Sequence, residues 1–310
     1  FFFLSGVLFS SKRYTSFIKY VTYKTKTLFL PFISLALLFV LLDWNTYLQP
    51  KVSIPSNLFA ILMGSGPAKA SPLWFVFILY CINLLYYWVD TKLETVSIKI
   101  IAILISSFLG YICFLKNIHL PFHVEVSFSA LTFLGTGNIL KKYIFKLESI
   151  LGLHKLWLMV IIVSLFCISF SAGIANFGAV LGQNIINNYG LFYISAFSGI
   201  LGVILLINYL IYLFDKVKAI DKIFHGLIYI AKNALPILGA QCYVIIIVDS
   251  IIKYGFTEEQ QLFAFFAKIV ALVLSMYLFI IPISFNKLYF LFGKEKQSWR
   301  SLLIIKQQYK

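Results

Sequence analysis

Residues 189–214 read YGLFYISAFSGILGVILLINYLIYLF and contain no charged side chain. The hydrocarbon core of a bilayer is about 30 Å thick, and a helix needs about 20 apolar residues to cross it. This stretch is therefore long enough to span a membrane. Its apolar residues form a block and do not alternate with polar ones, which favours a helix over a strand of a membrane β-barrel.

The whole chain of 310 residues shares this character, because 61% of its residues are hydrophobic and only 12% are charged. Soluble domains are about 45–50% apolar and about 25% charged. A soluble fold of this size could not hide so much apolar surface, whereas lipid solvates the side chains that face it. The composition therefore indicates an integral membrane protein.

Seven further apolar blocks are candidate spans, and the weakest is 124–140, which is short and carries Glu125. Residues 1–10 resemble the end of a ninth span. We predict an all-α, polytopic integral membrane helix bundle with eight full spans and one partial span, forming a single domain over residues 1–310. The seven blocks cover residues 28–48, 73–89, 97–115, 124–140, 153–172, 227–252 and 261–285.

The distribution of lysine and arginine gives the expected orientation, since these residues concentrate in cytoplasmic loops. Segments on the two sides of the predicted spans hold 20 and 4 of the 26 basic residues. The loop 11–27 and the tail 286–310 lie on the rich side, so we expect both to face the cytoplasm of a cell (plasma) membrane. One more helix before residue 1 would give about ten spans in the full-length protein.

The net charge of +15 follows from these loops. Contact with anionic lipid head groups accounts for most of the basic residues. They are scattered rather than gathered on one face, which argues against a nucleic-acid partner. The cysteines show no CxxC or CxxH spacing, so we expect neither a disulfide nor a metal site; they are Cys81, Cys113, Cys167 and Cys242.

Several short motifs follow one another along the chain in a characteristic order. FFFLSGVLF at 1–9 precedes KTLFLPF at 26–32 and PLWFV at 72–76. LPFHVE at 120–125 leads into ALTF at 130–133, GNILKK at 137–142 and IAKNAL at 230–235. In this order the set resembles the acyltransferase 3 family of membrane proteins, and most closely its branch related to fucose 4-O-acetylase.

The resemblance implies a membrane-bound O-acyltransferase with acetyl-CoA or another acyl-CoA as co-substrate and no bound cofactor. The acceptor would be a hydroxyl of a cell-envelope or secreted polysaccharide, or of its precursor. The family's first helix, which carries its catalytic His, is missing, so we expect the fragment alone to be inactive. Thr27 stands where an Arg is usual in the family, and Gln241 stands where a His is common.

The reaction needs a base for the acceptor hydroxyl and cations for the CoA phosphates. Glu125, which matches an acidic position of the family, is the candidate catalytic residue. Because acyl-CoA is cytoplasmic, the candidate phosphate ligands are four of the five cations of the loop 11–27, namely Lys12, Arg13, Lys24 and Lys26.

A polar cluster is expected on the acceptor side, toward the outer ends of the spans. Charges inside a membrane usually have partners, because an isolated charge costs about 2.5–3.5 kcal/mol at the bilayer centre. We therefore expect Asp249 and Lys268 to form an ion pair or to share a cavity with Glu125. The acceptor-side cluster would comprise His123, Asp249, Lys268 and Trp74.

Two other functions stay open at this point. A transporter or flippase for glycans or lipid-linked sugars would also use many spans and intramembrane charges. No internal symmetry of the kind many transporters show is visible in the sequence. A non-catalytic family member that binds glycan is the second alternative.

Overall fold

The computed structural model describes residues 1–42, 54–64, 73–144 and 155–214, together with a few isolated residues between 231 and 273. In this part of the chain the regular structure is helical, apart from one isolated bridge between Val180 and Ile185. The predicted all-α class is confirmed for these residues. The chain divides into two compact units, Phe1–Thr15 with Cys81–Ile223, and Ser16–Tyr80 with Phe224–Lys310.

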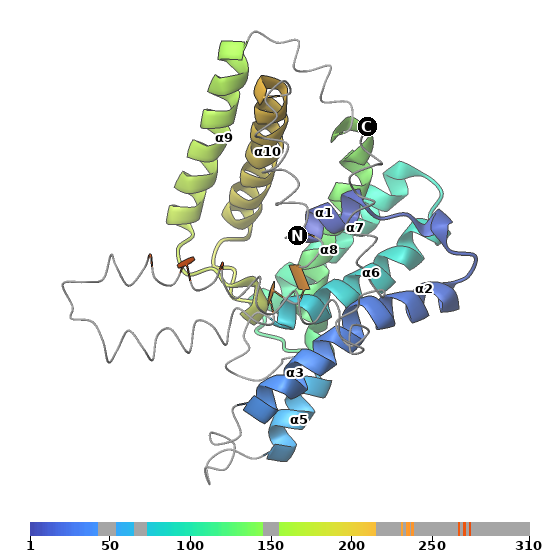
Figure 1. Cartoon of the computed structure of the whole chain (residues 1–310). Coiled ribbons are helices and arrows are strands. Elements are labelled where there is room, and N and C mark those ends of the chain that lie inside the picture. The colour runs from blue at the N-terminus through green and yellow to red at the C-terminus, as the bar shows by residue number, and fades with distance from the viewer. Residues whose placement is uncertain are drawn as a thin grey trace, which may run out of the picture. The chain divides into compact units, whose positions relative to one another are not determined.

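Unit 1 contains the long helices α7 to α10 (Figure 1). The boundary between the two units falls within α6, so that unit 1 includes this helix from Cys81 onward. Its short helical turns are η1 (Ser11–Arg13), η4 (Pro121–His123) and η6 (Leu181–Gln183). Its helices are α1 (Phe2–Val7), the end of α6 (Trp74–Lys92), α7 (Val96–Leu115), α8 (Val124–Ile144), α9 (Lys155–Ala175) and α10 (Tyr189–Phe214).

Helix α8 is packed between α1 and α7, and it contacts both. Small residues let α1 and α8 approach backbone to backbone, as in other membrane helix pairs. A Cβ added at Gly6 would lie 1.9 Å from the carbonyl oxygen of Leu134, and one added at Gly137 would lie 2.1 Å from that of Phe3. Only glycine fits at these two positions.

The end of α1 is held by side chains of α8. The last carbonyls of a helix lack partners within the helix and need donors from elsewhere. The Asn138 amide donates to the carbonyls of Gly6 and Phe9 at 3.3 and 3.2 Å, and the Lys141 ammonium donates to Phe9 at 3.0 Å. The Tyr86 hydroxyl of α6 donates to Asn138 Oδ1 at 3.1 Å, which fixes the amide.

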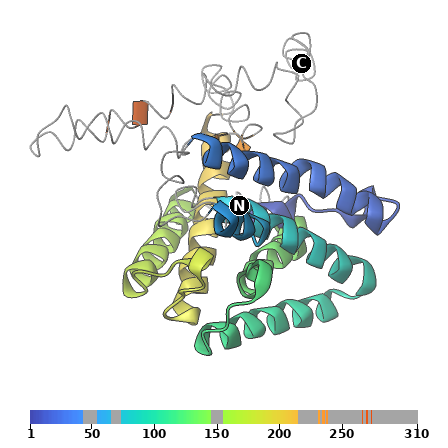
Figure 2. The same ribbon diagram turned by 90° about the horizontal axis from the view of Figure 1, so that it is seen from below.

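Helices α9 and α10 form an antiparallel pair that lies side by side in both views (Figures 1 and 2). Ser169 and Ser195 join them by reciprocal hydrogen bonds, each hydroxyl donating to the carbonyl of the other at 2.8 and 2.9 Å. Most apolar side chains of α9 are exposed, and Phe170, for example, is 71% exposed. Such a surface requires lipid around it.

Among the described residues, four helices are long and apolar enough to cross a membrane. They match the predicted blocks 73–89, 97–115, 153–172 and 189–214; their bounds are Trp74–Lys92, Val96–Leu115, Leu156–Ala175 and Tyr189–Ile211. The predicted block 124–140 forms the long helix α8, which carries too many polar residues to count as a span by composition. The count of eight is not confirmed, since blocks 227–252 and 261–285 lie largely outside the described residues.

Unit 2 contains α2 (Phe17–Lys24), a π-helical turn η2 (Thr25–Phe29), α3 (Leu30–Leu42), α5 (Ile54–Leu62) and the start of α6. Pro31 explains the π turn, because proline has no N–H and its ring clashes with the preceding turn of a regular helix. The backbone widens just before it, so that Leu30 N–H donates to the Thr25 carbonyl. The predicted block 28–48 is described only as far as Leu42.

Candidate functional site

The turn that precedes α8 is strained. Phe122 and His123 both have positive φ angles, 62° and 50°, which side chains with a Cβ rarely adopt. Such residues cost about 1–3 kcal/mol each and cluster at functional sites, where the surrounding structure imposes them. In this turn the strain brings His123 beside the first turn of α8.

Glu125 lies in that first turn and is only 1% exposed. A buried carboxylate is stable only when it is paired or hydrogen-bonded. Its Oε2 atom accepts the Leu120 N–H at 3.0 Å. Its Oε1 atom lies 3.6 Å from Nδ1 of His123 and 4.0 Å from Nδ1 of His119. The sequence analysis gave Glu125 as the candidate catalytic residue and placed His123 in the acceptor-side cluster; the structure brings the two side chains beside each other.

This histidine–carboxylate arrangement has a chemical use. A carboxylate near one imidazole nitrogen fixes the tautomer and orientation of the ring, and it stabilises the imidazolium that forms when the ring accepts a proton. The His123 side chain is 29% exposed, so an incoming hydroxyl can reach it. His119 is 64% exposed and lies farther from the carboxylate. His123 is therefore the better-placed base.

A band of hydroxyl groups continues from Glu125 along α8. Ser129 and Thr132 follow at spacings of four and seven residues, on the same face of the helix. Tyr189 of α10 shares a 2.7 Å hydrogen bond with Ser129. The Tyr193 hydroxyl lies 3.2 Å from the Ser129 carbonyl and 3.3 Å from the Thr132 hydroxyl. Buried hydroxyls satisfied in this way hold α8 and α10 in one fixed register.

Helix α7 completes this network. The Tyr189 hydroxyl donates to the Ser107 carbonyl at 3.0 Å, and the Ser107 hydroxyl donates to Tyr193 at 3.3 Å. Ser106 donates to the Phe128 carbonyl at 2.9 Å. Side-chain hydrogen bonds thus join α7, α8 and α10, and they lie toward the end of α8 that carries Glu125.

Two of the predicted CoA-phosphate ligands belong to unit 1. Lys12 and Arg13 lie in η1, directly after α1, and both are exposed. The neighbouring Ser11 hydroxyl donates to Asp90 at 2.6 Å, which fixes the turn. Asp90 also forms an ion pair with Lys99. The exposed Lys12 and Arg13 thus lie next to Ser11, whose partner Asp90 is already paired with Lys99.

The other two predicted ligands belong to unit 2. Lys24 ends α2 and its Nζ atom lies 5.6 Å from the ring centroid of Tyr20, a favourable position for a cation. Burial lowers the pKa of the Lys24 ammonium to about 8. Lys26 is exposed within the π turn. π turns are rare and occur frequently at functional sites.

Of the remaining candidate residues from the sequence analysis, Trp74 and Thr27 belong to unit 2, and the others lie outside the described residues. Trp74 begins α6 in the second unit and packs edge to face on Phe75, with ring centroids 6.3 Å apart. Thr27 donates to the Tyr23 carbonyl at 3.0 Å. Asp249, Lys268 and Gln241 lie outside the described residues, so their predicted roles stay predictions.

Sequence reasoning missed His119 and the tyrosine–serine network. The spacing of Glu125, Ser129 and Thr132 was visible as a polar stripe on one helix face. Their partners on α7 and α10 were not, because no local pattern indicates which helices meet.

Comparison with known proteins supports one assignment. No curated protein matches the chain, and no solved structure matches it. The sequence model of a family described as an acyltransferase domain matches residues 1–285, which is most of the chain. Together with the apolar helices, this match shows that the chain belongs to the acyltransferase 3 family of membrane acyltransferases.

Proposed function

We propose that the protein is an O-acyltransferase of the branch related to fucose 4-O-acetylase. It moves an acetyl group, or another acyl group, from acyl-CoA to a hydroxyl of a cell-envelope or secreted polysaccharide or of its precursor. It works in the plasma membrane, with the loop 11–27 and the tail in the cytoplasm. The observation that carries this proposal is the buried Glu125 beside the strained His123.

In this mechanism His123 is the base, a role that the family resemblance gives to a His on the first helix, and Glu125, the catalytic candidate of the sequence analysis, orients it. The imidazole takes the proton of the acceptor hydroxyl while the oxygen attacks the thioester carbonyl. The new C–O bond forms, the C–S bond breaks, and the CoA thiolate takes the proton back from the imidazolium. General-base catalysis of this kind contributes about 10²- to 10⁴-fold in rate.

The two substrates approach from opposite sides of the membrane. Helix α8 has 21 residues and is therefore about 30 Å long. In the proposed orientation Glu125 stands at its outer end, and Lys141 stands near its inner end. The thioester end of acyl-CoA must then reach into the bundle from the inner side, and the hydroxyl stripe of Ser129 and Thr132 provides polar groups along that way.

The central experiment is an acyl-transfer assay with labelled acetyl-CoA on membranes that contain the full-length protein. His123→Gln should lower transfer about 100-fold or more, because it removes the base. His119→Gln is the matched control, since this histidine is exposed and lies farther from the carboxylate. Equal loss in both variants, or full activity in His123→Gln, would exclude His123 as the base.

The donor side has its own test. Lys12, Arg13, Lys24 and Lys26 are proposed to bind the CoA phosphates by charge-assisted hydrogen bonds. Because the pKa of Lys24 is lowered to about 8, the residue loses its charge as the pH rises through that value. The KM for acyl-CoA should therefore rise above pH 8.

Arginine keeps its charge throughout this range. Lys24→Arg should flatten the rise in KM, while Lys26→Arg, the control, should keep the wild-type profile. A profile that is unchanged in Lys24→Arg would remove Lys24 from the donor site.

A further inference from the structure

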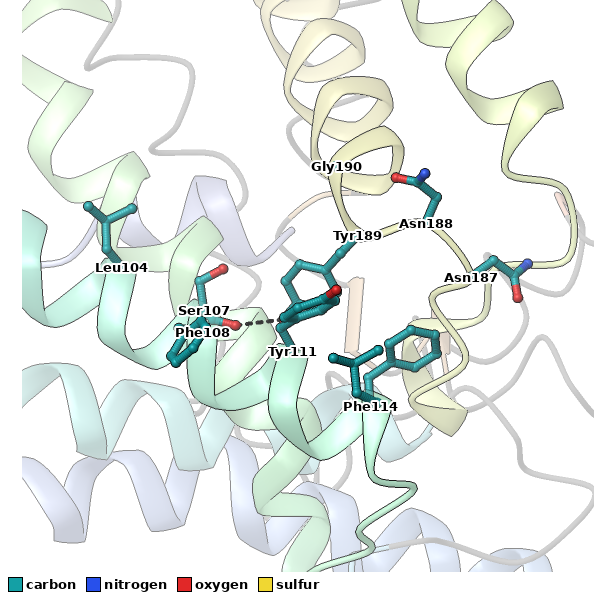
Figure 3. A pocket seen from close by; sticks show the side chains of 10 residues that line it. Leu104, Ser107, Phe108, Tyr111, Phe114, Asn187, Asn188, Tyr189 and Gly190 are labelled. Atoms are coloured by element: carbon teal, nitrogen blue, oxygen red, sulfur yellow. Dashed lines mark hydrogen bonds between the residues drawn. The ribbon is translucent and has the colours of Figure 1, made fainter.

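A cavity of about 440 Å³ lies in unit 1 between α7 and the start of α10. Figure 3 shows its side chains, with Tyr111 and Tyr189 facing each other at the centre. The two tyrosine rings have centroids 5.1 Å apart. On α7 the lining residues recur with helical spacing from Leu104 to Leu115, which corresponds to about 16 Å of helix. The cavity is therefore an elongated groove along α7.

One end of this groove is polar and preorganised. Asn176 accepts the Asn188 N–H at 2.8 Å and donates to the Ile186 carbonyl at 3.0 Å, which fixes the loop before α10. Asn188 Oδ1 caps α10 by accepting the Leu191 N–H at 3.0 Å. The Asn187 amide donates to the Phe177 carbonyl at 2.9 Å. Both asparagines line the groove, and these hydrogen bonds use the NH2 of Asn187 and the carbonyl oxygen of Asn188, which leaves the other half of each amide for a ligand.

The other end is apolar and opens sideways. Leu104 and Phe108 line the groove and are each 60% exposed. They belong to α7, which is apolar enough to span the membrane, so their exposed faces meet hydrocarbon. A ligand in the groove would have its polar part at the ends of α7 and α10 and its apolar part among lipid chains.

The lining carries no formal charge. All ten lining residues are described, and none of them is Lys, Arg, Asp or Glu. A phosphate head group would find no cation here, whereas amides, tyrosine hydroxyls and aromatic faces suit a neutral head rich in hydroxyls. Ligand sites of this kind combine aromatic walls with a few placed polar groups.

We propose that this groove binds a neutral glycolipid, with the sugar at Asn187, Asn188 and Tyr189 and the hydrocarbon chain along Leu104 and Phe108. This proposal rests on the proposed function, because it assigns the acceptor to a class: a sugar carried on a lipid without a charged head. The hydrogen bond between Tyr189 and Ser129 connects the groove to α8, one helical turn from Glu125. The sugar is thereby held near the proposed base.

The test is a binding experiment that needs no acyl transfer. Full-length protein in phosphatidylcholine nanodiscs is photolabelled with a diazirine-bearing alkyl glucoside, and the labelled peptides are identified by mass spectrometry. We expect labelling of the peptide that contains residues 104–115, and competition by dodecyl glucoside but not by free glucose. Tyr111→Ala should lower this labelling about five-fold or more, since an aromatic wall of the groove is lost.

Phe170→Ala is the matched control, because Phe170 is an exposed aromatic residue on α9 outside the groove. Leu104→Trp, which fills the apolar end, gives a second test if Tyr111→Ala does not fold. Equal competition by dodecylphosphocholine or by free glucose, or undiminished labelling in Tyr111→Ala and Leu104→Trp, would overturn the proposal. Labelling as expected in a protein that transfers no acyl group would refute the proposed function and leave the glycolipid site standing.

Discussion

Helices α8 and α9 have the same length of 21 residues but opposite surroundings. Most of the first half of α8 is buried, and it includes Glu125, Ser127 and Ser129. Helix α9 turns large apolar side chains such as Phe170 outward. Of these two helices, only α9 qualifies as a membrane span by its composition.

The difference follows from the solvent. Lipid is as apolar as leucine, so apolar surface alone does not drive helices together in a membrane; close packing and hydrogen bonds do. A helix in the middle of the bundle therefore carries small and polar residues, whereas a helix at its edge is uniformly apolar. Hence α8, which resembles a membrane span less than α9 does, carries the side chains that can take part in a reaction.

The largest effect is expected when a buried glycine of α8 is replaced. Gly137→Ala in α8 places a Cβ 2.1 Å from the Phe3 carbonyl oxygen, so α1 must move away. We expect a loss of about 3 kcal/mol in the free energy of unfolding, at the upper end for overpacking. Thermal unfolding of the purified protein in detergent would measure it.

Gly173→Ala in α9 is the control for this change. Its Cβ would lie 3.2 Å from the Ser195 hydroxyl, which needs a shift of only a few tenths of an ångström. Equal losses of stability in the two variants would contradict the close α1–α8 contact.

A smaller effect is expected at the serines. Ser129→Ala removes one partner of Tyr189 from the buried network, and one hydrogen bond is worth about 1 kcal/mol. Ser164→Ala on α9 changes an exposed serine and should be neutral. The same unfolding measurement applies, and a neutral Ser129→Ala would show that the network does not stabilise the α8–α10 contact.

The smallest effect is expected on the exposed face of α9. Phe170→Ala removes a large ring from α9 but leaves no cavity, because lipid fills the space. We expect a change within about 0.5 kcal/mol, as for substitutions away from packed features. A loss of several kcal/mol would mean that a protein surface, and not lipid, covers this face of α9.

Much of the chain could be predicted from local patterns. The apolar blocks 153–172 and 189–214 became α9 and α10, since a long apolar stretch has few other options in a membrane. The motifs at 1–9 and 137–142 indicated the family, and the structure gives two of their residues a role: Gly6 and Gly137 permit the α1–α8 contact. Glu125 and His123 could be chosen as site residues because polar groups are rare in such a sequence.

By itself, the sequence determined the membrane class, the helical state and the family, because these depend on composition, block length and motif order. Only the tertiary structure decided which polar groups meet. The strained turn that brings His123 within 3.6 Å of Glu125 and the contact of Tyr189 with Ser129 both join groups through backbone geometry and helix packing. The groove between α7 and α10 arises in the same way, from the facing surfaces of helices that are far apart in sequence. Such contacts depend on the mutual fit of surfaces, which one-dimensional patterns do not encode.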